Sequence, residues 1–184
     1  QAKAPSFDMS SFNAGNYNTA ISQSASAELI SKILYPNDNH TEGKILRLRQ
    51  QYFFSAASIA DILQNHLNQY GTLDNLADKI AIQLNDTHPT VAIPEMMRIL
   101  LDECSYEWDA AFDICRKVFA YTNHTVMSEA LEKWNADIFR NTLPRIWQIV
   151  CEMDRRCRAD LAKAFPGDQG KIDYMAIIGD NQVR

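Results

Sequence analysis

The sequence lacks the patterns that mark several common classes of protein. Its six glycines are isolated, so no glycine-rich phosphate loop is present. No apolar run reaches the roughly twenty residues that a transmembrane helix needs. The 18 basic residues are outnumbered by 23 acidic ones, and the net charge of −5 leaves no basic face for nucleic acid. These absences argue against a P-loop enzyme, a membrane-spanning protein and a nucleic-acid-binding protein.

Cysteine and nucleophile signatures are missing as well. The four cysteines show no Cys-x-x-Cys spacing, which predicts neither a zinc site nor a disulfide framework. No His-Glu-x-x-His motif and no nucleophile elbow occurs. Three Asn-x-Thr sequons, beginning at Asn39, Asn85 and Asn123, would indicate a secreted glycoprotein only if a signal peptide were present. We see no such segment and expect a cytoplasmic protein with reduced thiols.

What the chain does contain is enough apolar sequence, 46% of its 184 residues, to build a packed domain. Apolar spacing of three and four predicts helices, and short β-branched runs predict strands. The few strands indicate a helix-rich α/β protein whose sheet is small or lacks some of its strands. We expect a loop over 1–15, helices over 16–34, 42–67, 90–102, 105–117 and 143–165, and strands over 79–84, 118–121 and 174–178.

Three polar clusters, at 34–41, 84–90 and 121–125, follow apolar runs and hold three of the four histidines. They combine amides, a carboxylate, imidazoles and hydroxyls, the groups that bind a neutral polyhydroxylated ligand. Ligands of α/β sheets bind beyond the carboxyl ends of strands, so the clusters could converge on one pocket. His66, next to Asn65 on a helix, is expected at the surface.

Each cluster also has a simpler interpretation. Asn, Asp and Thr after an apolar run cap helices and shape turns. A metal site would use Asp86, His88 and His124, although their spacing matches no zinc-hydrolase signature. The three tryptophans could stack on sugars or pack in the core, and their helical surroundings favour the core. These alternatives remain open on the residues alone.

The clusters and their neighbours strongly resemble the glycogen/starch/maltodextrin (α-glucan) phosphorylase family. The motifs occur in the family's order along nearly the whole chain. The residues that carry the resemblance are Leu34-Tyr35-Pro36-Asn37-Asp38-Asn39, Glu42-Gly43-Lys44, Arg47-Leu48, Gln51-Tyr52-Phe53, Ile82 to Pro89, Ala92-Ile93-Pro94-Glu95, Ala120 to Thr125, Glu129 to Trp134 and Leu143-Pro144-Arg145.

The resemblance implies phosphorolysis of α-1,4-glucans by orthophosphate, releasing glucose 1-phosphate with pyridoxal phosphate as cofactor. It implies that residues 1–184 are a single segment of the N-terminal, Rossmann-like half of a two-domain GT-B-type glycosyltransferase fold. The C-terminal phosphorylase domain, which holds the cofactor, is absent from this sequence. The resemblance leaves open whether the full enzyme is a homodimer. This segment is expected to hold no cofactor-binding residue and no metal ligand.

Site roles are likewise implied by the resemblance. Asn39 would bind the 2-hydroxyl of the glucosyl unit. His124 would contact the 6-hydroxyl and place its backbone carbonyl near the anomeric carbon. Asp86 and His88 would lie toward the acceptor-side sugar. Tyr35, Asp38 and His40 share the loop of Asn39, and Tyr35 would offer a ring face to that sugar.

The chain departs from the family at two places. Gln64 and Asn65 stand where regulated animal members have an arginine pair for a nucleotide phosphate, so we expect no such allosteric control. His40 replaces an aromatic residue of an inhibitor site. Because only one wall of an active site is present, the isolated chain is expected to be inactive. The alternative function is a non-catalytic carbohydrate-binding module derived from a phosphorylase.

Overall fold

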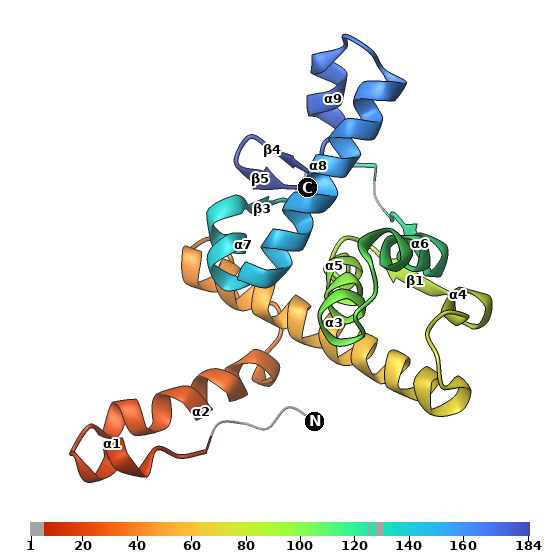
Figure 1. The fold of residues 1–184 in the computed structure, drawn as a ribbon. Coiled ribbons are helices and arrows are strands. Elements are labelled where there is room, and N and C mark those ends of the chain that lie inside the picture. The colour runs from red at the N-terminus through yellow and green to blue at the C-terminus, as the bar shows by residue number, and fades with distance from the viewer. Residues whose placement is uncertain (1–5, 125, 128–130) are drawn as a thin grey trace. The chain divides into compact units, whose positions relative to one another are not determined.

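The computed structural model describes residues 6–124, 126–127 and 131–184 (Figure 1). The chain divides into two compact units, Gln1–Phe53 (unit 1) and Phe54–Arg184 (unit 2). Their boundary falls within a helix, α3 (Thr41–Tyr70), and not in a polar linker. That residues 1–184 form a single segment of a larger N-terminal domain stays a prediction.

Unit 1 begins with a short helix where the composition predicted a loop. In α1 (Met9–Asn13), the Asp8 carboxylate accepts hydrogen bonds from the backbone N–H groups of Ser10 at 3.0 Å and Ser11 at 3.1 Å. This N-cap satisfies donors that helix formation would otherwise leave unpaired. The loop prediction is therefore wrong at α1, and residues 1–5 lie outside the described part.

The second helix of unit 1, α2 (Tyr17–Lys32), confirms the predicted helix but buries little of itself. Ala20 is its one buried residue, while Ile21 and Leu29 are exposed. The first turns of α3, which begins as predicted within one residue, complete the unit.

Unit 2 holds the core and the strands. Most of the predicted elements are confirmed, with shifts of a few residues at their ends. After α3 the chain forms α4 (Leu76–Lys79), β1 (Ile82–Asn85), α5 (Ala92–Arg98), the π-helical turn η1 (Ile99–Glu103), α6 (Trp108–Val118), β2 (Phe119–Thr122), β3 (Trp134–Asn135), α7 (Ala136–Thr142), α8 (Pro144–Ala164), α9 (Gln169–Met175), β4 (Ile178–Gly179) and β5 (Gln182–Val183).

Two small sheets make this a helix-rich α/β chain, as expected. The first pairs β1 with β2 in parallel, and the second is antiparallel with the order β3-β5-β4. None of the described helices is both long and apolar enough to cross a lipid bilayer.

The core of unit 2 lies where α5, α6 and α8 pack together, with α8 the long blue helix of Figure 1. Burial raises the pKa of the Cys115 thiol within this core to about 12, and the four cysteines are all free. The buried apolar cluster consists of Ile59, Leu63, Leu73, Leu76, Leu84, Ala92, Met96, Met97, Ile99, Leu100, Ala111, Ile114, Cys115, Val118 and Ile149.

Two sequence-based expectations about unit 2 are wrong. His66 is 2% exposed, and its Nε2 lies 2.8 Å from Oδ1 of Asn75, because the chain after α3 folds back over the histidine. Of the strand expected over 174–178, Tyr174 and Met175 end α9, and only Ile178 lies in a strand, β4. Asp168 caps α9 by accepting from the backbone N–H of Lys171 at 3.0 Å.

Candidate functional site

The second and third polar clusters lie side by side because the strands before them pair in parallel. Ile82 pairs with Phe119, and Asn85 pairs with Thr122 at the carboxyl ends of β1 and β2. The backbone N–H of Asp86 donates to the carbonyl of Thr122 at 3.0 Å, which extends the pairing by one step. The strand pairing therefore places these two clusters next to each other, and their convergence with the first cluster on one pocket stays a prediction.

Two side-chain contacts cross the strand pair, and the contact of Asn85 with His124 joins the two clusters. Asn85 Oδ1 lies against Nε2 of His124, and Nε2 of Gln83 donates to Oγ1 of Thr122. All four side chains are on exposed residues. His124, the residue with the most important implied role, is thus anchored by an amide of the neighbouring strand. Sequence reasoning assigned no role to Asn85 or Gln83, since their contacts depend on the register of the two strands.

Asp86 and His88 follow β1 in a tight turn. Asp86 has a φ of 69°, in the left-handed region, and its Oδ1 accepts from the backbone N–H of Thr87 at 2.7 Å. The ring of His88 lies with Nδ1 3.6 Å from Oε2 of Glu132, whose side chain is 16% exposed. Glu132 belongs to a motif of the resemblance but was not predicted as a site residue. Its partner is 44 positions away, so no local signal marks the contact.

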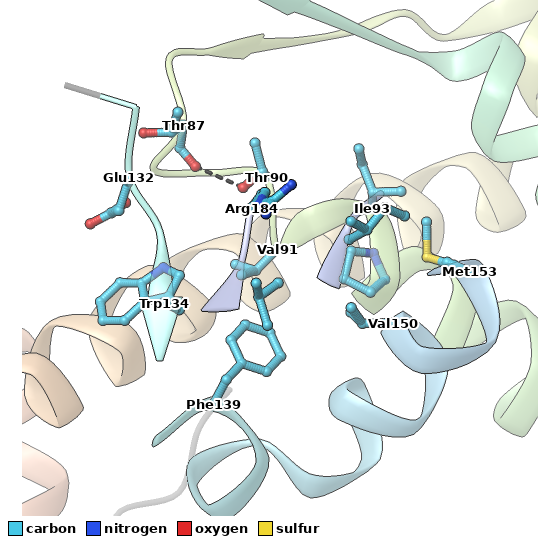
Figure 2. A pocket seen from close by; sticks show the side chains of 13 residues that line it. Thr87, Thr90, Val91, Ile93, Glu132, Trp134, Phe139, Val150, Met153 and Arg184 are labelled. Carbon is cyan, nitrogen blue, oxygen red and sulfur yellow. Dashed lines mark hydrogen bonds between the residues drawn. The ribbon is translucent and has the colours of Figure 1, made fainter. Parts of the chain in front are cut away.

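Glu132 also lines a pocket of about 260 Å³ (Figure 2). The wall is mostly apolar, with Trp134 and Phe139 on one side and residues of α5 and α8 on the other. Thr87 Oγ1 is buried and has no hydrogen-bond partner within the part of the chain that the structure describes. The pocket is therefore mostly apolar, with Glu132 and Arg184 as the charged residues of its lining.

The first cluster belongs to unit 1 and is shaped by its own short-range contacts. Asn37 Oδ1 accepts from the backbone N–H of Asn39 at 2.9 Å, and Tyr35 has a φ of 55°. The guanidinium of Arg47 lies 5.9 Å from the Tyr35 ring centroid and 4.0 Å from an oxygen of Asp38. Tyr35, Asp38 and Asn39 stay exposed and open to a ligand.

His40 closes this loop onto the start of α3. Its Nδ1 accepts from the backbone N–H of Gly43 at 3.0 Å and lies 3.4 Å from Oε2 of Glu42. Accepting the hydrogen bond requires an unprotonated Nδ1, so in that state the Glu42 contact is not an ion pair. A Cβ on Gly43 would overlap the carbonyl oxygen of Asn37. Glycine is therefore required here by the close approach of the loop.

Asn39 and His40 lie in unit 1, whereas Asp86, His88 and His124 lie in unit 2. The structure thus brings together two of the three clusters, and a joint site with the first stays a prediction.

The metal alternative gains no support from the geometry. Among the described residues, no three His, Cys, Asp or Glu side chains approach closely enough to hold an ion, and this includes Asp86, His88 and His124.

The three tryptophans were expected either to stack on sugars or to pack in the core, and their burial lies between these two cases. Trp108, Trp134 and Trp147 are all partly buried. Trp108 carries the guanidinium of Arg156 5.0 Å from its ring centroid, and Trp147 lies 6.4 Å from Phe139, which is a core residue. Both contacts show the rings engaged with protein side chains.

Comparison with known proteins decides the family. The family model described as carbohydrate phosphorylase matches residues 1–184. The chain belongs to the carbohydrate phosphorylase family. It is 46% identical over 172 residues to a glycogen phosphorylase of Chlamydia trachomatis, covering 94% of this chain and 21% of that protein. It is 47% identical over 175 residues to the glycogen phosphorylase of Saccharomyces cerevisiae, covering 95% of this chain and 19% of that protein.

A human relative gives the same result. The muscle form of glycogen phosphorylase is 45% identical over 192 aligned residues, which cover all of this chain and 23% of that protein. The chain therefore spans about a fifth of the length of these phosphorylases. The resemblance read from the sequence motifs is confirmed.

Proposed function

We propose that this chain is a segment of an α-1,4-glucan phosphorylase, a glycosyltransferase, and that it supplies loops that bind the glucosyl unit. Family membership along the whole chain supports the proposal. The observation that carries it is the fixed pairing of Asn85 with His124 at the carboxyl ends of two parallel strands, where α/β proteins bind their ligands. The fold that we propose for the complete half is Rossmann-like, with further strands beside β1 and β2.

In this proposal the residues of the segment position the sugar. Asn39 holds the 2-hydroxyl, His124 contacts the 6-hydroxyl, and the His124 carbonyl faces the anomeric carbon. Glycosyl transfer passes through an oxocarbenium-like state, which fixed dipoles and hydroxyl contacts stabilise. Asp86 and His88 contact the acceptor-side sugar, with Tyr35 offering its ring face. The His88–Glu132 pair would hold that imidazole in place.

Pyridoxal phosphate supplies the acid-base group in this proposal, and we propose that it is bound by a lysine outside the described residues. A lysine that forms an imine needs to be at least partly desolvated so that its amine is uncharged. The described lysines are exposed: Lys32, Lys44, Lys79, Lys117, Lys133, Lys163 and Lys171. We therefore assign the cofactor and the orthophosphate site to the C-terminal domain of the full-length enzyme, for which we propose a cytoplasmic location and a homodimeric state.

The proposal on nucleotide control depends on Gln64 and Asn65, which stand where regulated members of the family have an arginine pair. Gln64 and Asn65 at the end of α3 carry no charge, and Gln64 donates to Asn68 while Asn65 donates to Asp61. Neutral amides cannot neutralise a phosphate as an arginine pair does. We propose that the full enzyme lacks that mode of nucleotide control.

The test is release of glucose 1-phosphate from maltodextrin and orthophosphate by the full-length polypeptide that carries this segment. His124→Ala is expected to lower kcat/KM about tenfold, because it removes one neutral hydrogen bond to the 6-hydroxyl and keeps the backbone carbonyl. Lys117→Ala, at an exposed position on α6, is the matched control and should leave the rate unchanged.

Residues 1–184 alone should release no product, because the opposite wall of the site is missing. Phosphorolysis by the isolated chain would contradict the assignment of the cofactor to another domain. A full-length polypeptide that binds maltodextrin without phosphorolysis would support the non-catalytic module instead.

A further inference from the structure

Asn85 and Gln83 project from the same face of β1. Residues two apart on a strand share a face, and Leu84 between them is 3% exposed and belongs to the core. The register pairs Gln83 with Ala120 and Asn85 with Thr122. Gln83 nevertheless contacts Thr122, and Asn85 contacts His124, so each side chain reaches two positions beyond its register partner. The two contacts therefore share one geometry and lie next to each other along the strand pair.

Asn85 projects from the backbone of a strand, whereas His124 projects from a segment outside the helices and strands. The backbone bond from Asp86 N to Thr122 O fixes the last residues of β1 and β2 against each other at 3.0 Å. His124 comes two residues after β2, outside any regular element. The orientation of its ring is therefore set by the partner that the rigid strand presents to it.

An amide oxygen can only accept a hydrogen bond, so the imidazole nitrogen that faces Asn85 Oδ1 must carry the proton. That nitrogen is Nε2. A neutral imidazole with its proton on Nε2 has a lone pair on Nδ1 and offers an acceptor there. Metal-binding histidines are oriented by the same kind of second contact.

We propose that Asn85 is a positioning residue that holds His124 in the tautomer whose Nδ1 accepts a hydrogen bond from a hydroxyl of the bound glucosyl unit. The inference rests on the proposed function, which assigns the 6-hydroxyl to His124. It adds the direction of that hydrogen bond: the sugar donates and the histidine accepts. No proton leaves the sugar in this contact.

The experiment measures glucan synthesis, the reverse reaction, by the full-length polypeptide. Its two donor substrates are α-glucose 1-phosphate and the 6-deoxy analogue, which lacks the donating hydroxyl. The unaltered enzyme should prefer the 6-hydroxylated substrate about tenfold in kcat/KM, as expected for one neutral hydrogen bond. Asn85→Leu should lower this preference to about twofold, and His124→Ala should do the same. The double variant should be no worse than His124→Ala alone.

Two further variants separate positioning from general structure. Gln83→Leu removes the neighbouring contact with Thr122 and leaves the Asn85–His124 contact in place, so it should keep the tenfold preference. Asn85→Asp keeps an acceptor oxygen and should keep the preference at high pH.

The outcomes distinguish this inference from the function on which it rests. An unaltered enzyme without activity on either substrate would overturn the proposed function and, with it, this inference. An active enzyme in which Asn85→Leu slows both substrates equally, with the preference kept, would overturn the inference alone. Loss of the preference in Gln83→Leu would also contradict it, because the effect would then belong to the strand pair as a whole.

Discussion

The two units differ in where their apolar side chains lie. In unit 2, β1 and the helices around it bury a continuous cluster in which Met97 and Leu100 are fully enclosed. In unit 1, α2 buries Ala20 and leaves Ile21 51% exposed. An isolated helix of this length is marginal in water, because most helical stability in proteins comes from packing. Local signals thus suffice to place a helix, and burial decides how strongly it is held.

The largest expected effect tests this contrast directly. Met97→Ala should lower the free energy of unfolding by about 3 kcal/mol, because it leaves a cavity in a closely packed core. Ile21→Ala should change it by less than about 0.5 kcal/mol. Urea denaturation of residues 1–184, followed by circular dichroism, measures both. Similar losses in the two variants would show that α2 is packed as tightly as α5.

A buried ion pair gives the next effect. Glu95 is 2% exposed, and its two oxygens accept from Nε and Nη2 of Arg98 at 2.9 Å each. Glu95→Ala should cost about 2 kcal/mol, because Arg98 keeps a second partner in Glu103 at 2.7 Å. Denaturation of the single variant and of the Glu95→Ala/Arg98→Met double variant provides the test. A double variant less stable than the single one would show that the remaining guanidinium is not the source of the cost.

The smallest effect compares one cap from each unit. Asp8 caps α1, and Asn135 caps α7 by accepting from the N–H groups of Asp137 and Ile138 at 3.0 and 3.1 Å. Hydrogen bonds from Ser11 hold the pKa of Asp8 below its ordinary value of 3.8. Because the folded pKa is the lower one, the cap contributes above the unfolded pKa and is lost as pH falls through the folded pKa.

Amide exchange at Ser10 and Ser11 should therefore become several-fold less protected as pH falls from about 5 to 3, after correction for the intrinsic exchange rate. Exchange at Asp137 and Ile138 should not change in this way, because an amide cap does not titrate. Equal loss of protection at both caps would assign the effect to general acid unfolding.

The sequence predicted the elements that local periodicity specifies. Regular apolar spacing predicted five of the observed elements. They are the helices α3, α6 and α8 and the strands β1 and β2. The adjacency of the second and third clusters followed from strand ends. The capped helices α1 and α9 were missed, since each is short and depends on one aspartate side chain.

The missed site contacts have a different cause. Asn85 meets His124, and His88 meets Glu132, only through the strand register and a long return of the chain. Asn75 likewise covers His66 by folding back after α3. Spacing along the sequence carries no information on such contacts, because they are set by tertiary packing.

Gly43 has a consequence for reading genetic variation in this protein. Any codon change that replaces it adds a Cβ into the space taken by the Asn37 carbonyl, and Asn37 is the residue whose side chain holds the backbone of Asn39. Judged by residue type alone, a Gly43→Ala variant would count as a conservative change on a helix. Its damage would fall on the loop that presents Tyr35 and Asn39, so even alanine belongs among the variants to test first.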